Sequence, residues 1–404
     1  MTRAGFCCVL LVFLSGCASD RYWGSEGHRS FEKRDWDQAA SVWAKDAQKP
    51  GTNQLLFKLD QATALFNAGK YNEAIPIFLL AEDLAEIKDF TSIGEEVGVL
   101  ATGQNTRGYK GEDFEKVLIN VYLALSFAAL GNVEEAQVEC RKINLLLNRM
   151  ITDGKRNYEE SPFARYLSGM LWESSGEWNS AYIDYKFAYE LDPTLPGLAS
   201  DLIFAAQKMG FRDEESKWRI AHPEAPIRKD QKGWGELVLI YQQGRSPRKQ
   251  PRYEDRTLPR FVARSSDDYG ARVVVDGEAR GELRATLDIS NTSIRYLEDR
   301  IGRLKAAQLA GLATKAAIGV GVAKMSKNDD LGLLAFYALM ASDQADLRSW
   351  STLPASLQIL RLPVPAGKHQ VTLEVMGPSN SVIRRIEVGE VDIKARSKKF
   401  IVGR

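Results

Sequence analysis

The side chains that could do chemistry are few in this sequence, and none of them stands in a catalytic pattern. The histidines His28, His222 and His369 lie in three different predicted contexts, and none belongs to an HExxH motif. The sequence has no GxSxG elbow, no GxxxxGK loop and no CxxC pair. We therefore expect no catalytic residue, no metal ligand and no cofactor, and we predict that the protein is not an enzyme.

The one residue with an assignable chemical fate is Cys17. An apolar run over residues 4–14 follows Arg3, and it is shorter than the roughly 20 apolar residues that span a bilayer. Directly after this run comes LSGC, residues 14–17, which resembles the lipobox of bacterial lipoproteins. In those proteins the cysteine is acylated, for example with palmitate, and the preceding peptide is removed. The resemblance implies a signal peptide at residues 1–16 and lipid attachment at Cys17.

The position after Cys17 bears on which membrane would hold the lipid anchor. In Gram-negative lipoproteins an aspartate there tends to retain the protein at the inner membrane, whereas this chain has Ala18. The resemblance thus implies an outer-membrane location facing the periplasm. Cys7 and Cys8 would be lost with the signal peptide, so Cys140 is left without an intramolecular partner and is expected as a small buried side chain.

Composition argues against a polyelectrolyte ligand. The 404 residues include 54 basic and 53 acidic side chains, so no overall field attracts nucleic acid, and we expect no nucleic-acid partner. With 44% hydrophobic residues the chain is long enough for two domains, each with its own core.

The first half carries helical repeats. The stretch 163–193 has the order and spacing of a tetratricopeptide repeat, in which Gly169 and Ala181 let two helices approach and Pro193 ends the second. Related units lie at residues 61–85 and 122–140, a degenerate unit precedes them, and a further helix pair follows at 198–221. About one repeat length separates the two related units. It holds the Gly-rich stretch 92–116, which we interpret as a loop folded over the repeats or meeting a partner.

The second half changes to the short, β-branched runs that are typical of strands. Asp276-Gly277 is a turn dipeptide between two of them, and the basic stretch 245–260 is expected as a linker or an edge covering. The predicted strands are Glu236–Tyr241, Ala271–Val275, Gly281–Leu287, Leu357–Leu362, His369–Val375, Ile383–Ile393 and Phe400–Val402.

A helical hairpin interrupts these strands, with its turn at Ser326–Asp330. The segment Ala306–Ala323 is nearly all small and apolar, which suits close helix packing. We expect the hairpin to cover one face of the sheet; the alternative is contact with a membrane or a partner pore.

Together these patterns predict an α+β chain. It has an N-terminal all-α tetratricopeptide-repeat solenoid at 17–226, a strand and linker at 227–260, and a β-sandwich-like domain at 261–404 with the helical hairpin inserted at about 292–345.

The stretch ADLRSWSTLP, residues 345–354, carries the candidate contact residues Arg348 and Trp350. Exposed arginine and tryptophan dominate binding hot spots, so one interpretation makes both residues contacts with a partner protein. The other pairs Arg348 with Asp346 or a carbonyl and places Trp350 in the core.

Several stretches together resemble a family of Gram-negative envelope lipoproteins with tetratricopeptide repeats. They are the lipobox, GYKGEDFEKVLINVYLAL at 108–125, AQVECRKIN at 136–144, GELVLIYQQG at 235–244 and LRSWSTLP at 347–354. The resemblance implies no reaction.

The leading functional hypothesis is a periplasmic scaffold for protein–protein interaction in cell-envelope biogenesis or assembly. Its repeat groove would bind an envelope protein or peptide, and the lipid anchor would hold it at the membrane. One alternative is a glycan-binding or hydrolytic module acting on the cell wall. Another is a piloting lipoprotein for a secretion or surface-appendage machine.

Overall fold

The computed structural model describes residues 25–89, 108–154, 161–228, 231–341 and 343–404. The expected signal peptide, Cys17 and most of the Gly-rich stretch 92–116 lie outside these residues, so the structure does not test the predictions made for them.

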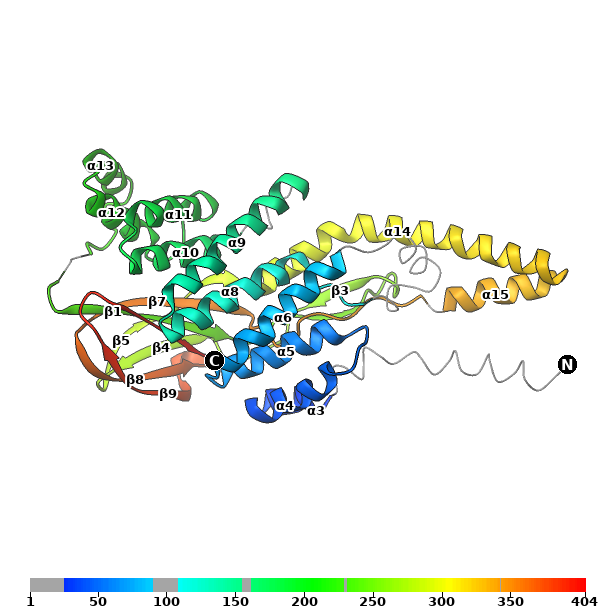
Figure 1. The fold of residues 1–404 in the computed structure, drawn as a ribbon, viewed down its shortest axis with the longest axis horizontal. Coiled ribbons are helices and arrows are strands. Elements are labelled where there is room, and N and C mark those ends of the chain that lie inside the picture. Colours follow the sequence, from blue (N-terminus) through cyan, green and yellow to red (C-terminus); the bar gives the residue numbers. More distant parts are fainter. Residues whose placement is uncertain (1–24, 90–107, 155–160, 229–230, 342) are drawn as a thin grey trace.

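The first half is a stack of antiparallel helix pairs in which each helix contacts the next (Figure 1). The helices are α3 (Glu26–Glu32), α4 (Trp36–Ala47), α5 (Gln54–Asn67), α6 (Tyr71–Asp89), α8 (Asp113–Leu130), α9 (Val133–Gly154), α10 (Pro162–Ser174), α11 (Trp178–Leu191), α12 (Leu198–Met209) and α13 (Arg212–Ala221).

The turn inside each pair has the same backbone geometry. A residue with positive φ ends the first helix in every case, and in four of the five pairs it is glycine, which adopts this conformation without strain. These residues are Gly69, Gly131, Gly176 and Gly210, with φ of 72°, 83°, 77° and 73°. In the degenerate first pair Arg34 takes this place with φ 64°. The repeat pattern read from the sequence therefore corresponds to a repeated turn.

The pair α10–α11 shows why the repeat needs a small residue. A Cβ on Gly169 would lie 2.4 Å from Cδ1 of Tyr185, so only glycine lets the tyrosine ring lie against the α10 backbone. Tyr185 and Ala181 are fully buried in this contact. Cys140 in α9 is 1% exposed, as expected, and burial raises the pKa of its thiol.

The second half contains two four-stranded sheets and a ribbon. One sheet has the order β10-β1-β7-β6 and the other β5-β4-β8-β9, while β2 pairs with β3. The strands are β1 (Trp234–Gln243), β2 (Arg248–Pro251), β3 (Pro259–Val262), β4 (Gly270–Val275), β5 (Glu278–Glu282), β6 (Arg284–Asp288), β7 (Ser356–Pro365), β8 (Gly367–Met376), β9 (Val382–Ile393) and β10 (Lys398–Gly403).

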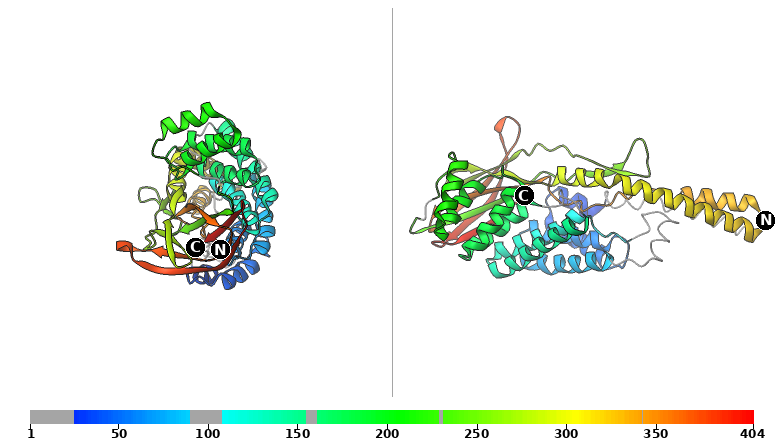
Figure 2. Two further views of the ribbon diagram at one scale, coloured as in Figure 1. Left: turned by 90° about the vertical axis from the view of Figure 1, so that its left-hand side faces the viewer. Right: turned by 90° about the horizontal axis from the view of Figure 1, so that it is seen from above.

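The first sheet is sandwiched between the helices and the second sheet. Along β1, Val238 and Ile240 belong to the core shared with the repeats, whereas Leu237, Leu239 and Tyr241 belong to the core shared with β4 and β8. The helices curve around this sheet, as the view down the long axis shows (Figure 2). The result is three layers: repeats, first sheet, second sheet.

Two boundaries differ from the sequence-based prediction. The stretch 227–260 is not a separate strand and linker, because β1 is an inner strand between β10 and β7, and residues 248–262 form the β2–β3 ribbon. The predicted strand Gly281–Leu287 is two strands in different sheets, β5 and β6, separated at the buried Leu283. Asp276 and Gly277 form the expected turn, with φ of 52° and 83°.

The helical hairpin consists of α14 (Ile289–Ser326) and α15 (Asp329–Ala341). We expected it to cover a face of the sheet, and this is wrong. The first half of α14 contacts the body, from buried side chains such as Tyr296 and Leu297 to Gln308, and the distal part extends away from it with α15 (Figures 1 and 2). Both sheet faces are already covered, one by the repeats and one by the other sheet.

Candidate functional site: a charged groove between the repeats and the sheet

The two residues singled out as partner contacts lie inside the protein. Arg348 is 5% exposed and Trp350 is 1% exposed. Arg348 forms a bidentate pair with Asp346, its Nη2 lying 2.7 Å from Oδ2, and it also donates to the carbonyl of Thr52. The interpretation of these residues as exposed contacts is therefore wrong, and the alternative of an internal ion pair and a core tryptophan holds.

Trp350 fixes the segment that enters β7 against the repeats. Its indole Nε1 donates to Thr63 Oγ1 at 3.0 Å, and its backbone N–H donates to the buried carboxylate of Glu115 at 2.8 Å. Its ring lies 5.5 Å from that of Tyr122 and 6.1 Å from that of Phe78. Both N–H groups of this residue thus have a partner, which buried polar groups require.

The concave surface of the repeats is filled by the protein's own chain. Tyr122 in α8 donates to Gln242 in β1 at 2.7 Å, and Thr352 donates to the buried Asp60 of α5 at 2.8 Å. A hydrogen bond of 2.5 Å joins His28 to Ser351. The groove that we expected to hold a partner is therefore occupied in this region by β1, β7, β10 and the segment before β7.

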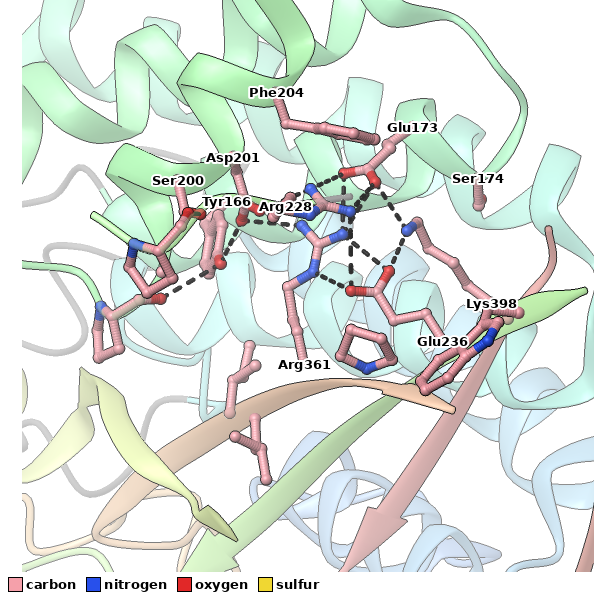
Figure 3. Close-up of a pocket in the computed structure, with 18 of the residues that line it drawn as sticks. Tyr166, Glu173, Ser174, Ser200, Asp201, Phe204, Arg228, Glu236, Arg361 and Lys398 are labelled. Carbon is pink, nitrogen blue, oxygen red and sulfur yellow. Dashed lines mark hydrogen bonds and ion pairs between the residues drawn. The ribbon is translucent and has the colours of Figure 1, made fainter. Parts of the chain in front are cut away.

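An open groove remains where the later repeats meet one end of the sheet (Figure 3). It has a volume of about 1080 Å³ and lies between α10, α12, the segment around Arg228 and the starts of β1 and β10. This volume is slightly above the usual range for ligand sites, about 300–1,000 Å³. It is the candidate functional site.

The floor of the groove is a cluster of three carboxylates and three cations. The carboxylates are Glu173 on α10, Asp201 on α12 and Glu236 on β1, and the cations are Arg228, Arg361 on β7 and Lys398 on β10. Arg361 is central: it lies 2.9 Å from Glu173, 2.8 Å from Asp201 and 2.8 Å from Glu236 (Figure 3).

Tyrosine hydroxyl groups donate further hydrogen bonds to two of the three carboxylates. Tyr185 donates to Glu173 at 2.5 Å, and Tyr166 donates to Asp201 at 2.6 Å. The Glu173 side chain is 2% exposed and that of Asp201 is 3% exposed. Such burial is tolerated because each charge is paired and hydrogen-bonded.

The cluster keeps its glutamates ionised. Burial by itself disfavours a carboxylate, but Arg361, Lys398 and Arg228 outweigh it and hold the pKa of Glu236 at about 2. The same three cations hold the pKa of Glu173 well below its usual range against the opposing effect of burial. Neither glutamate carries a proton at neutral pH, so neither is suited to act as the general acid of glycoside hydrolysis.

The rim of the groove is basic and partly apolar. Lys208, Arg284 and Arg396 are exposed there, against one acidic residue, Glu282. The whole lining has six basic and four acidic side chains. The apolar surface comes from Trp178, Phe204, Ile227 and Trp234. An acidic ligand with apolar groups matches this surface, because its charge is attracted and its apolar area is covered.

We looked for metal sites and for clustered histidines within the ranges that the structure describes. No group of three His, Cys, Asp or Glu side chains there could hold a metal ion. The three histidines bond separately, His28 to Ser25, His222 to Tyr189 and His369 to Asp276.

Sequence reasoning missed all six residues of the cluster. Glu236 begins the run GELVLIY and Arg361 interrupts LQILRLPV, so each is a charge inside an otherwise apolar strand. That is a usable signal, because a charge on a buried strand needs a partner of opposite sign. The sequence did not show which charges would meet, since the six residues come from six separate stretches of the chain.

The solved structures that are similar to this chain match about half of it. No protein-family profile matches the chain, and no curated protein matches it. A crystal structure of MamA is 17% identical over 50% of this chain and 94% of its own, with a TM-score of 0.34. A protein of Podosopora anserina with TPR-like repeats is 15% identical over 50% of this chain and 88% of its own, with a TM-score of 0.32. We assign the class of fold, a TPR-like repeat stack joined to a β-sandwich, from the helix pairs, turns and sheets described above.

Replacing Trp350 with alanine should lower the free energy of unfolding by about 3–5 kcal/mol, the usual cost of deleting a buried aromatic side chain. Urea denaturation followed by circular dichroism measures this. Tyr253→Ala is the control, because Tyr253 is 81% exposed, and it should change stability by less than about 0.5 kcal/mol. Equal effects would show that Trp350 does not anchor the two halves.

Acid should lower the contribution of the ion cluster to the free energy of unfolding. Because the folded pKa of Glu236 is about 2, below its ordinary value, its contribution is complete above about pH 4.5 and is lost as the pH falls toward 2. Glu236→Gln should lose about 3–5 kcal/mol at pH 7, since it leaves buried cations short of a partner. Its stability should then fall less steeply than that of the wild type between pH 4.5 and 2.5.

Urea unfolding at several pH values measures this, with Glu390→Gln as the control. Glu390 pairs with Lys368 on the surface, at 52% and 67% side-chain exposure, so its replacement should cost less than about 1 kcal/mol. If the Glu236 variant and the wild type had parallel pH profiles, the cluster would not depend on that charge.

Proposed function

We propose that this protein is a lipid-anchored scaffold of the bacterial envelope that binds another protein through the groove between α10, α12 and the sheet. The observation that supports it is that the protein's own sheet fills the concave face of the repeats, while this groove stays open at about 1080 Å³. Repeat proteins bind partners through extended surfaces of this kind.

The ion cluster supports a binding role and not a reaction. Its six charges are matched in number, and each carboxylate already has at least two cations within 4.0 Å. Such a cluster provides a rigid floor, and a rigid floor lowers the ordering cost of binding. The same pairing removes the free acid and free base that hydrolysis of cell-wall glycans needs.

The partner expected here is an acidic segment of an envelope protein that also carries apolar side chains. Lys208, Arg284 and Arg396 would attract it, and Trp178 and Ile227 offer apolar contact area. Rim charges act mainly on specificity and association rate. The resemblance of residues 14–17 to a lipobox, together with Ala18, supports the proposal of a location at the outer membrane, facing the periplasm.

Charge reversal at the rim tests the groove. A photoreactive residue at the adjacent position Ile227 should cross-link the native protein to a defined set of envelope proteins. Adding Arg284→Glu and Arg396→Glu should reduce these adducts about tenfold or more, because attraction becomes repulsion. Both arginines are exposed, so folding should be unaffected.

The matched control reverses Lys368 and Arg385, which are 67% and 64% exposed and lie on the second sheet, away from the groove. Adducts should persist in this variant. Adducts that survive reversal at the rim, or that disappear equally in the control, would argue against the groove as the binding site.

Labelling with radioactive palmitate tests the anchor. Wild-type protein should incorporate the label and sediment with the membrane, whereas Cys17→Ser should lose both properties, since acylation needs the thiol and stable anchoring needs the acyl chains. Cys140→Ala is the control, because Cys140 is buried in α9. Equal incorporation into wild type and Cys17→Ser would remove the anchor and the localisation with it.

A further inference from the structure

Part of one strand has an unpaired edge inside the groove. β7 pairs with β1 along its whole length, from Ser356 to Pro365, but it pairs with β6 only from Ser356 to Ile359. That ladder ends at the pair of Arg284 and Ile359, and no strand that the structure describes pairs with β7 beyond it on the same side. Residues of this remaining stretch, 360–365, line the groove. We call it the open edge of β7.

The edge is open because the chain changes sheets between β5 and β6. The next pair of the ladder would be Glu282 and Arg361, but Glu282 pairs with Arg272 of β4 in the second sheet. Leu283 also donates its N–H to the carbonyl of Ala271 at 2.8 Å. β5 therefore turns away from β7, and the groove lies where the two strands separate, since Glu282 and Arg361 both line it.

Strand alternation shows which main-chain groups face the groove. In a ladder, successive residues of a strand point their N–H and C=O groups to opposite neighbours. Ala366, directly after β7, donates to the carbonyl of Gly233, directly before β1, at 2.7 Å. Even-numbered residues of β7 therefore face β1, and the odd-numbered Arg361, Pro363 and Pro365 face the open side.

Two prolines limit what can pair with this edge. Proline has no N–H, so Pro363 and Pro365 offer only their carbonyl groups. The carbonyl of Pro365 already accepts a hydrogen bond from His369 at 2.9 Å. Prolines are a common protection of sheet edges against unwanted pairing. Arg361 remains the residue of the open edge that can offer both N–H and C=O, so the edge suits a short strand in one register.

The ion cluster holds Arg361 in place. Its guanidinium lies 2.9 Å from Glu173, 2.8 Å from Asp201 and 2.8 Å from Glu236, and its side chain is 9% exposed (Figure 3). The main chain at this position is therefore ordered before anything binds to it. Pairing with an ordered edge has a lower entropic cost than pairing with a mobile one.

We propose that an extended segment of the partner adds to the open edge of β7 as a short antiparallel strand, an inference that rests on the groove being the binding site. Its main chain exchanges hydrogen bonds in both directions with Arg361 and donates another to the carbonyl of Pro363. Its side chains alternate between the repeats, where Trp178 and Lys208 line the groove, and the second sheet.

A synthetic peptide tests the pairing directly. The probe is an acetylated and amidated peptide of four Val-Glu repeats, which is acidic and partly apolar and whose alternating valines favour an extended strand. It should bind the purified full chain saturably, and hydrogen exchange resolved to single amides should slow at Arg361. The control is β9, the open edge strand of the second sheet, whose amides should exchange at unchanged rates.

N-methylation of the probe separates main-chain pairing from charge attraction. Two versions carry N-methyl groups on the valines or on the glutamates, so each lacks the N–H groups of one strand edge. At least one of them should bind about tenfold more weakly or worse, because donors are lost while the charge is kept. Equal affinity of all three peptides would overturn strand addition.

Pro363→Ala tests the edge from the side of the protein. Alanine adds one N–H to the open edge, so the affinity for the unmodified probe should rise about fivefold. Pro363 is exposed, and circular dichroism should show unchanged folding. Pro196→Ala is the matched control, because Pro196 lines the groove outside any strand, and it should leave the affinity unchanged. No gain with Pro363→Ala would contradict the proposed pairing.

The outcomes distinguish this inference from the proposed function. Suppose that envelope proteins cross-link at Ile227 and that reversal of Arg284 and Arg396 abolishes the adducts. If the probe then fails to bind, or binds without slowing exchange at Arg361, strand addition is refuted and the groove still stands as a site that binds through side chains. If the probe fails to bind and no envelope protein cross-links at Ile227, both are refuted.

Discussion

The cluster of three carboxylates and three cations beneath the groove is the interaction on which the rest of this structure depends. It joins residues of α10, α12, β1, β7 and β10, so it links every layer except the outer sheet. Because every member except Arg228 has a side chain no more than 10% exposed, a missing partner would leave a poorly solvated charge. This favours one relative position of the repeats and the sheet. The open groove exists because that position is fixed.

The same constraint changes what the repeats can do. A free repeat stack would offer its concave surface to a partner, but here the sheet and the segment around Trp350 occupy it. Asp60 and Glu115 are buried acids that bond to this segment, and they make the surface specific for it. The basic groove at the end of the stack remains open to other molecules.

Local structure was readable from the sequence. The unit 163–193 is the pair α10–α11, the turn Asp276-Gly277 lies where its dipeptide predicts, and the hairpin turns near Ser326–Asp330. The predictions that failed concerned how the helices and strands pack together. Gly281–Leu287 reads as one strand because both of its parts are extended, and it is divided by its two sheets. Arg348 and Trp350 have the residue types of a binding hot spot, yet they are internal, because residue type does not encode which surface the repeats will cover.

By itself the sequence determined the elements of this protein, its repeat turns and the lipobox that makes Cys17 a candidate for acylation. These follow from interactions between residues a few positions apart, namely helical spacing, glycine at positive φ and strand alternation. The tertiary structure alone decided that the sheet fills the concave face, that six distant charges meet, and that the hairpin stands away from the body. Each of these depends on contacts between residues far apart in the chain, for which local spacing carries no signal.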